Sequence, residues 1–306
     1  MMKLHHLRDF LAIVEKESIS AAAKYLGIAQ PSLSRSIREL EKELGVPLFE
    51  RHARGAALTQ MGTVFARRAR MAVRELEKGR DEISQIQGEV HGDVAVCISG
   101  VSHLTLLGAA LRPFQKRYPL VKLNLIEGVY PLYENRLKQG LIDVYVGPAP
   151  EGGSPPELKV EKLFQPSRVV LARQGHPLAG ATSIRELLGA DWLTTSITDK
   201  AEAEFGAIFD QIGLPQPHLS MRVSSALTLI TALISSDALV ISSRTWADMP
   251  MFKSHLTVLD VEEVLTAPPI ALVYRSAVPP TPAAEYFCDM IRRAALPMMK
   301  LYPQKP

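Results

Sequence analysis

The chain has 306 residues, of which 47% are hydrophobic and 22% charged, and its formal net charge is +3. This length predicts about two domains, and the composition excludes a disordered chain, which lacks the apolar surface that offsets ordering entropy. Two cysteines exclude a disulfide framework, and no apolar run reaches the ~18 residues of a membrane span. The N-terminal segment mixes charged and apolar side chains, unlike a secretory signal, so we expect a soluble, cytoplasmic protein without membrane contact.

The positive surplus lies in the first ninety residues, which hold 15 of the 35 Lys and Arg residues and 12 of the 32 Asp and Glu residues. The rest of the chain therefore holds 20 of each and is neutral. A charged run is most often a solvated face. A basic N-terminal module on a neutral body nevertheless indicates a negatively charged partner for that module.

The first fifty residues carry the pattern of a helix-turn-helix. Leucines at helical spacing predict an amphipathic helix over 3–16. Ser18 is a good N-cap for a short alanine-rich helix over 19–26, which Gly27 is suited to end. Pro31 then opens a third helix, because proline is tolerated in a first turn.

The third helix has two different faces. At 100° per residue, its aliphatic side chains fall within about 40° of one another and predict a buried stripe. Hydroxyl and guanidinium groups lie opposite, and such a face suits a DNA major groove. A plain three-helix bundle with a solvated outer face is the alternative. The stripe consists of Leu33, Ile37, Leu40 and Leu44, and the opposite face of Pro31, Ser34, Arg35, Arg38 and Lys42, with Ser32 on its flank.

Two extended segments around a basic glycine turn follow and predict a β-hairpin wing. Its Arg51 and Arg54 would contact DNA phosphates, which position a protein without reading sequence. Residues 60–90 then read as one proline-free helix.

Small and apolar residues in this long helix alternate at spacings of 4 and 3, the heptad pattern of a coiled coil. A two-fold dimer would also suit a palindromic DNA site. A helix packed on its own domain is the alternative interpretation. The expected seam consists of Phe65, Ala69, Ala72, Leu76, Gly79, Ile83, Ile86 and Val90.

Several motifs over residues 4–62 occur together: the pair Ala22-Ala23, the run QPSLSRSIRELE from Gln30, the run LGVPLFER from Leu44, and a Leu-Thr-x-x-Gly close at Gly62. In this order they resemble the N-terminal domain of LysR-type transcriptional regulators. The resemblance implies a winged helix-turn-helix over 1–59, a linker and dimerisation helix over 60–90, and a tetramer. It also implies that DNA is contacted by Ser20, Gln30, Pro31, Ser32, Ser34, Arg35 and Arg38, with Arg51 and Arg54 on the wing.

From Gly92 onward, β-branched runs alternate with helical stretches, which predicts a doubly wound α/β body. The expected strands are 93–98, 122–126, 142–146, 168–172, 219–223, 238–241 and 270–274, and the expected helices are 103–117, 130–139, 199–212 and 225–234.

The family resemblance extends into this body through the run from Asn135 to Val144 and the Gly-His-Pro-Leu turn at Gly175. It implies an effector-binding domain over 91–306, built from two subdomains like those of a small periplasmic binding protein. Subdomain one is expected at 92–164 plus 266–300 and subdomain two at 165–265, with a hinged cleft between them. The segment 235–242 departs from the family pattern, since its two glycines and its proline are replaced.

A ligand of such a body is expected beyond the carboxyl ends of the strands, against helix N-termini that favour an anion. Hydroxyl-rich turns follow three expected strands, although a serine before a helix is often only an N-cap. With the family analogy, we expect a small organic anion to contact Ser99, Val101, Ser102, Tyr130, Thr195, Ser196, Phe205 and Ser224.

Catalytic and metal signatures are absent from the sequence. Nucleophile-elbow, phosphate-loop and metalloprotease motifs do not occur, so we expect no catalytic residue, no metal and no cofactor beyond the effector. Cys97 and Cys288 read as buried apolar fillers, and His176 as structural.

The sequence is compatible with three functions, one preferred and two alternatives. The preferred one is a ligand-gated regulator, with promoter DNA, a second copy of the chain and RNA polymerase as expected partners. The effector is expected to be an aromatic acid or a sulfonate, as in activators of aromatic catabolism that this chain resembles. A constitutive DNA-binding regulator without effector and an α/β enzyme with an accessory DNA-binding arm are the alternatives.

Overall fold

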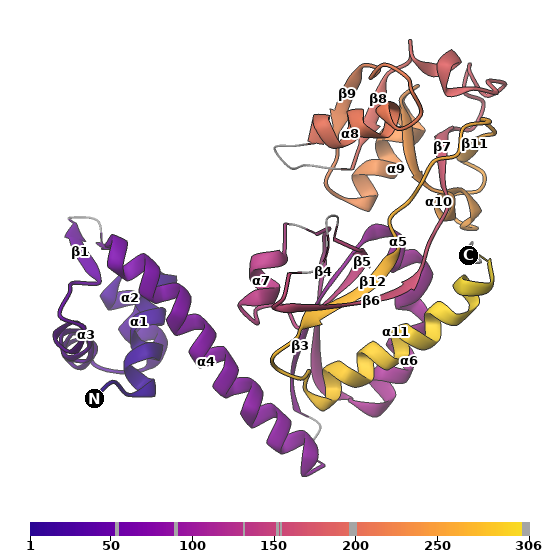
Figure 1. Ribbon diagram of the computed structural model, residues 1–306. Coiled ribbons are helices and arrows are strands. Elements are labelled where there is room, and N and C mark those ends of the chain that lie inside the picture. Colours follow the sequence, from indigo (N-terminus) through magenta and orange to yellow (C-terminus); the bar gives the residue numbers. More distant parts are fainter. Residues whose placement is uncertain are drawn as a thin grey trace. The chain divides into compact units, whose positions relative to one another are not determined.

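The computed structural model describes residues 1–52, 55–88, 91–130, 132–150, 153, 155–195 and 201–301. It consists of two compact units, Met1–Ser84 and Gln85–Pro306 (Figure 1). Within the described part of the chain, no helix is both long and apolar enough to cross a membrane. The predicted architecture of a winged helix-turn-helix, a long helix and an α/β body with two sheets is confirmed.

The first unit contains three helices, a hairpin and a long fourth helix. Its elements are α1 (Leu4–Lys16), α2 (Ile19–Leu26), α3 (Gln30–Leu44), β1 (Phe49–His52), β2 (Gly55–Leu58) and α4 (Gln60–Ile86). Ser18 caps α2 by accepting a hydrogen bond from the Ala21 amide, and Gly27 ends it with φ 68°. The sequence signals for these helix ends therefore act as predicted.

The core of this unit forms where α1, α3 and the first turns of α4 meet. Phe10 and Leu33 are fully buried, and Phe65 lies at their edge with its ring centroid 5.2 Å from that of Phe10. Gly62 of α4 passes so close to β1 that a Cβ there would lie 2.0 Å from the carbonyl oxygen of Leu48. The start of α4 is therefore built into the first unit.

This packing corrects part of the expected coiled-coil seam. Phe65 and Ala69 pack into the core of their own unit instead of facing a partner chain, because the first turns of α4 close that core. Farther along α4 the seam positions Ala72, Leu76, Ile83 and Ile86 are exposed. The expected helix end is also shorter: α4 ends at Ile86, and Val90 lies outside the described residues.

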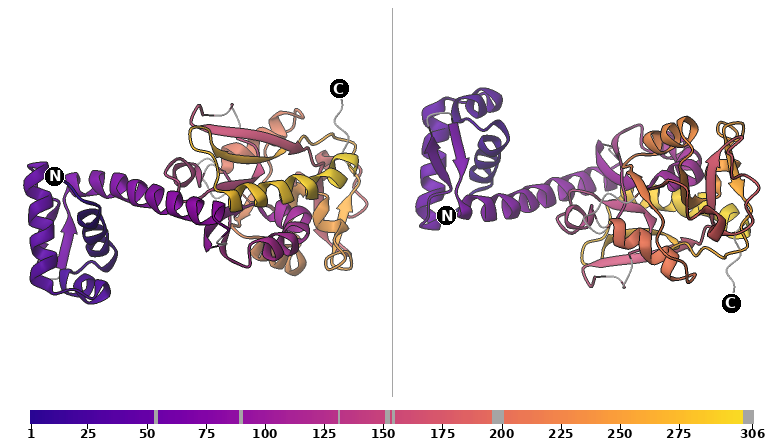
Figure 2. Two further views of the ribbon diagram at one scale, coloured as in Figure 1. Left: turned by 90° about the horizontal axis from the view of Figure 1, so that it is seen from below. Right: turned by 90° about the horizontal axis from the view of Figure 1, so that it is seen from above.

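The second unit contains two five-stranded sheets, each covered by helices (Figure 2). The first sheet has the order β4-β3-β5-β12-β6, in which β3 runs parallel to β4 and β5, and β12 runs antiparallel to β5 and β6. Its strands are β3 (His91–Ile98), β4 (Leu120–Glu127), β5 (Val144–Pro148), β6 (Leu158–Phe164) and β12 (Ile270–Arg275). Its helices are α5 (Gly100–Ser102), a π-helical segment (His103–Leu107), α6 (Gly108–Arg117), α7 (Glu134–Lys138) and α11 (Pro282–Leu301).

The second sheet has the order β11-β7-β10-β8-β9. Its strands are β7 (Arg168–Arg173), β8 (Trp192–Thr194), β9 (Leu219–Arg222), β10 (Leu239–Ser243) and β11 (Leu256–Leu259). Its helices are a 3-10 turn (Ile184–Leu187), α8 (Ala201–Asp210), α9 (Ala226–Ser235) and α10 (Thr245–Asp248). Three strands, β6, β8 and β11, were not predicted from the sequence, and the helix expected over 130–139 is confined to Glu134–Lys138.

The chain passes between the two sheets at 165–167 and again at 260–269. These two crossings are tied together by hydrogen bonds. The side-chain amide of Gln165 donates to the backbone carbonyl of Ala267 (2.8 Å), and the Arg168 guanidinium donates to the backbone carbonyl of Thr266 (3.2 Å). The sheets are thus joined by a narrow, internally bonded connection.

Candidate functional site

The exposed face of α3 is the candidate DNA-binding surface. Leu33, Ile37 and Leu40 are buried against the core, as predicted from the helical arithmetic. The residues expected to contact DNA are solvent-exposed with one exception, Ser34, which is half-buried; the exposed ones are Ser20 of α2 and Gln30, Pro31, Ser32, Arg35 and Arg38 of α3.

Two polar contacts that the sequence did not reveal fix the position of this helix. The Ser36 hydroxyl, buried on the inner side of α3, donates to the Asp9 carboxylate of α1 (2.5 Å). At the other end, the Glu41 carboxylate accepts from the Leu48 and Phe49 amides (2.7 and 3.2 Å), which ties α3 to the wing. Hydrogen bonds to a charged group are the stronger class, so these contacts hold the recognition face rigidly on its scaffold.

The wing is described only in part. The backbone of Arg51 lies in β1 opposite Ala56, which confirms the predicted hairpin. The side chain of Arg51 and the whole of Arg54 lie outside the described residues, so their expected phosphate contacts stay predictions.

The second unit holds a cavity of about 440 Å³ between its two sheets. It is lined by the predicted residues Ser99, Val101, Thr195 and Ser224. Hydroxyl-bearing turns from both sheets therefore meet at one cavity, as the ends of the expected strands suggested. Ser196 lies outside the described residues.

Three other predicted contact residues do not line this cavity. Ser102 is fully buried, and its hydroxyl lies 3.0 Å from that of Ser99, within hydrogen-bond distance. Ser102 therefore contacts Ser99 and not the cavity. Tyr130 packs against Tyr145 in the core beside the first sheet. Phe205 packs between Trp192 and Phe209 in the core beneath the second sheet. Neither aromatic residue is among those that line the cavity, because Phe205 is buried in its core and Tyr130 packs beside Tyr145.

Charged and hydroxyl residues outside the expected contact set also line the cavity: Glu127, Tyr133, Arg168, Ser225, Ser242 and Ser243. Glu127 ends β4 and Ser243 ends β10, so the rule that selected Ser99 could have found both. Arg168 begins its strand, but β7 is antiparallel to β10, and this pairing sets Arg168 opposite Ser243. Only the sheet topology could place it at this edge.

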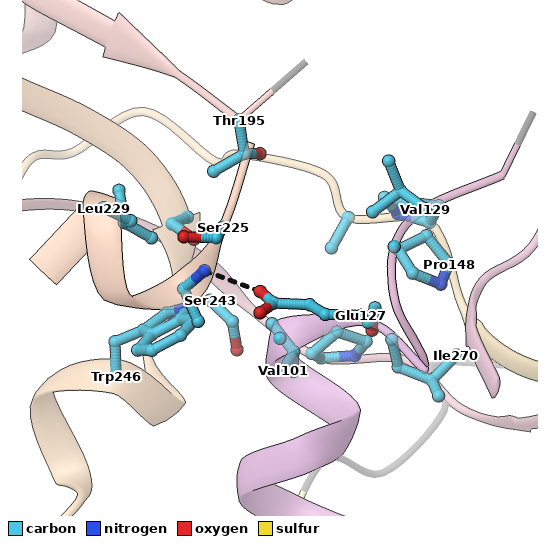
Figure 3. A pocket seen from close by; sticks show the side chains of 18 of the residues that line it. Val101, Glu127, Val129, Pro148, Thr195, Ser225, Leu229, Ser243, Trp246 and Ile270 are labelled. Atoms are coloured by element: carbon cyan, nitrogen blue, oxygen red, sulfur yellow. Dashed lines mark hydrogen bonds between the residues drawn. The ribbon is translucent and has the colours of Figure 1, made fainter. Parts of the chain in front are cut away.

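Glu127 makes the most direct polar contact between the two sides of the cavity (Figure 3). Its Oε1 accepts a hydrogen bond of 2.6 Å from the backbone N–H of Ala226, the first residue of α9. The preceding Ser225 caps the same helix through the Thr228 amide (3.2 Å). The carboxylate therefore lies at the N-terminus of α9, where the partial positive charge of a helix attracts an anion.

The floor of the cavity is a close apolar contact between the subdomains. A Cβ on Gly100 would lie 3.1 Å from the Trp246 ring and 3.5 Å from the Ala226 side chain. Val101 and Leu104 of the first subdomain pack against the apolar core of the second. The glycine thus lies where α5 closely approaches α9 and α10.

Residues 235–242, which depart from the family pattern, are held in place by contacts with side chains from another part of the chain. Asp237 stands where the second glycine is expected, and its carboxylate forms an ion pair with Arg173 (2.6 Å). Its backbone carbonyl lies 3.0 Å from Nε2 of His176, whose Nδ1 accepts from the Leu178 amide (3.0 Å). The structural interpretation of His176 agrees with these contacts. Ser242, at the expected proline, forms part of the cavity wall.

Among the described residues, neither the two cysteines nor any cluster of side chains indicates redox chemistry or a metal site. Burial raises the pKa of the Cys97 thiol to about 12, and it also raises the pKa of Cys288, so both stay protonated and weakly reactive. No group of three or more His, Cys, Asp or Glu side chains in the described ranges is arranged to hold a metal ion.

Both units of the chain match models of known protein families. Residues 4–63 match the family model described as bacterial regulatory helix-turn-helix protein, lysR family, and residues 87–296 match the one described as LysR substrate binding domain. The transcriptional regulator GbpR of Azospirillum brasilense is 22% identical over 308 residues, which cover 100% of this chain and 90% of that protein. PcaQ of Agrobacterium fabrum is 25% identical over 299 residues, which cover 96% and 95%.

Solved structures show the same fold. The crystal structure of CbnR, a LysR family transcriptional regulator, has a TM-score of 0.70 at 21% identity and covers 96% of this chain and 99% of that chain. Full-length CbnR complexed with its target DNA also has a TM-score of 0.70, at 22% identity, with 96% and 100% covered. Since the substrate-binding model alone matches more than half of the chain, this protein belongs to the LysR family and is a DNA-binding transcriptional regulator with a substrate-binding domain, not an enzyme.

Proposed function

We propose that this regulator works in the cytoplasm, binds a specific promoter sequence as a dimer or tetramer, and is controlled by a small organic acid. The observation that carries the proposal is the cavity of about 440 Å³ between two sheets joined by a narrow connection. Its volume falls in the range of small-molecule sites. A ligand that contacts both walls favours one arrangement of the two subdomains over others.

The walls support an acid with an apolar body. Leu229, Trp246 and Ile270 form apolar surface, while Ser99, Thr195 and Ser224 bring hydroxyl groups to the same space. The hydroxyl groups of the wall can donate hydrogen bonds to a carboxylate or sulfonate of the ligand, and the apolar surface of the wall can pack against an aromatic ring of the ligand. An aromatic acid or sulfonate is therefore the effector class with which to begin.

Promoter recognition is assigned to the exposed face of α3, because side chains with several hydrogen-bond donors can read base edges there. The exposed apolar stripe of α4, which consists of Met61, Val64, Ala72, Leu76, Ile83 and Ile86, supports pairing of two chains through this helix. Paired chains would place two α3 helices on the two halves of a palindromic site.

Ligand and DNA would be coupled through the arrangement of the subdomains. A coupling free energy of about 1–3 kcal/mol suffices to change DNA bending or contact with RNA polymerase. By this mechanism the chain would act as an activator once its effector binds. Constitutive DNA binding without an effector is the competing proposal, in which the cavity has no regulatory ligand.

The test uses the full-length protein in two measurements. Binding to promoter fragments and to scrambled DNA at about 150 mM salt should differ by at least ~10³-fold for a specific regulator. Thermal shift with a panel of organic acids should then reveal ligands, because a compound that binds only the folded chain raises its stability. A large specificity ratio that no compound alters would favour the constitutive alternative.

A further inference from the structure

The described residues that line the cavity carry two charges of opposite sign. Glu127 contributes a carboxylate from the end of β4, and Arg168 contributes a guanidinium from the start of β7. The other described lining residues are apolar or bear hydroxyl groups. The described wall is therefore neutral in sum but has separate negative and positive groups.

The negative charge is fixed in place. Oε1 of Glu127 is held by the Ala226 N–H at 2.6 Å, and among the described residues no cation pairs with this carboxylate. Figure 3 shows the Glu127 side chain reaching across the cavity toward the first turn of α9. An anion placed beside it would meet like-charge repulsion in a partly enclosed site.

The positive charge comes from another element of the wall, the start of β7. Arg168 donates to the carbonyl of Thr266 and places a positive charge in the wall, in addition to the hydroxyl groups of Ser99 and Thr195. Guanidinium and hydroxyl donors together suit an acid group on the ligand. The wall thus offers complementary partners to an acid and to a cation at once.

From this charge pattern we infer that the effector is zwitterionic, an organic acid that also carries an ammonium group, and that Glu127 is the residue that recognises the ammonium. The inference rests on the proposed control by an organic acid and narrows its chemical class. Leu229, Trp246 and Ile270 would contact the apolar part of the same molecule. Glu127 is then the residue that sets specificity for amino acids over simple acids.

Matched ligand pairs test this inference on the full chain. Each pair shares a carbon skeleton and differs in the ammonium group: phenylalanine and 3-phenylpropionate, leucine and 4-methylpentanoate, 4-(aminomethyl)benzoate and 4-methylbenzoate. The measurements are thermal shift and tryptophan fluorescence, to which Trp192 and the cavity-lining Trp246 both contribute. We expect at least one zwitterion to bind about tenfold more tightly than its matched acid, since a hydrogen bond to a charged group is involved.

The variant Glu127→Gln keeps an oxygen that accepts from Ala226 but removes the charge. It should reduce the preference for the zwitterion to about twofold or less, whereas Glu202→Gln, an exposed carboxylate change on α8, should leave that preference intact. Circular dichroism and promoter binding check that both variants are folded.

Two outcomes overturn the inference. One is that no ammonium-bearing compound binds the parent up to about 10 mM; the other is that the preference survives Glu127→Gln. If simple acids bind the parent while their zwitterionic partners do not, the inference fails and the proposed control by an organic acid stands. If promoter binding is absent as well, the proposed function itself fails.

Discussion

The carboxylate of Glu127 and the backbone N–H of Ala226 lie 2.6 Å apart, and this hydrogen bond joins the last residue of β4 to the first residue of α9. The two residues belong to different sheets. Together with the two adjacent crossings and the apolar packing of Val101 and Leu104 on the second subdomain, this bond restrains how far the cavity can open.

Replacing Glu127 with alanine should loosen this restraint. The Glu127 side chain is largely exposed, so the loss is expected at the low end for a charge-assisted hydrogen bond, about 1 kcal/mol. Amide hydrogen exchange should accelerate about fivefold in the first turn of α9, while α11 should be unchanged. Glu202→Ala, an exposed change on α8, is the control. Unchanged exchange at α9 would show that the bond does not hold the subdomains.

Replacing Arg35 with alanine should weaken promoter binding by about 1–3 kcal/mol and relax its sequence preference. The reason is that Arg35 is exposed on the outer face of α3, where base edges would be read. Arg8 is equally exposed but lies on α1, so Arg8→Ala serves as the control for a lost positive charge. Equal affinities of parent and Arg35→Ala for the promoter fragment would remove Arg35 from the recognition surface.

The recognition helix was predictable because its signals are local. Pro31 opens it, Gly45 ends it with φ 71°, and the aliphatic period fixes which face is buried. The polar contacts that position it were not, since Ser36 and Asp9 are 27 residues apart and only the tertiary fold brings them together. Short-range patterns therefore give the element and its faces, but not the side-chain contacts that orient it.

The cavity was predictable in part for a similar reason. Ser99 and Ser224 follow strands, and strand ends can be read from the sequence. Arg168 begins β7, and no local sequence pattern shows that β7 pairs antiparallel with β10. The position of Arg168 beside the cavity could therefore not be predicted. Phe205 was expected at the cavity as an apolar residue of a short helix, but such a residue suits a core face equally well, and the structure buries it in the core.

Replacing Leu76 with lysine should disrupt pairing of two chains. Leu76 is 54% exposed in the described chain and lies in the apolar stripe of α4, so a charge there would be buried in a dimer without a partner. Sedimentation velocity should show a monomer. Thr63→Lys places the same charge about 140° around the helix and should sediment as the parent. A Leu76→Lys protein that sediments as the parent would exclude this stripe as the dimer contact.

Replacing Gly62 with alanine should destabilise the first unit, although alanine ordinarily favours a helix. The added Cβ would lie 2.0 Å from the carbonyl oxygen of Leu48 and 2.9 Å from a Leu58 methyl carbon, so α4 and the hairpin must separate. Overpacking of this kind costs about 1–3 kcal/mol. The Leu-Thr-x-x-Gly motif is thereby explained by backbone approach as well as by the bond from the Gly62 amide to the Thr59 hydroxyl (2.9 Å).

Gly79 offers a matched control in the same helix. No atom of its own chain lies within 4 Å of a Cβ built there, so in the monomer, where the seam is not covered, Gly79→Ala should stabilise α4 by about 0.5–1 kcal/mol through helix propensity. Thermal unfolding of both variants at equal protein concentration separates the two effects. Opposite signs of the shift in melting temperature would confirm that contact with the wing, and not helix propensity, requires glycine at position 62. A stabilised Gly62→Ala protein would mean that the hairpin yields freely and does not set the position of α4.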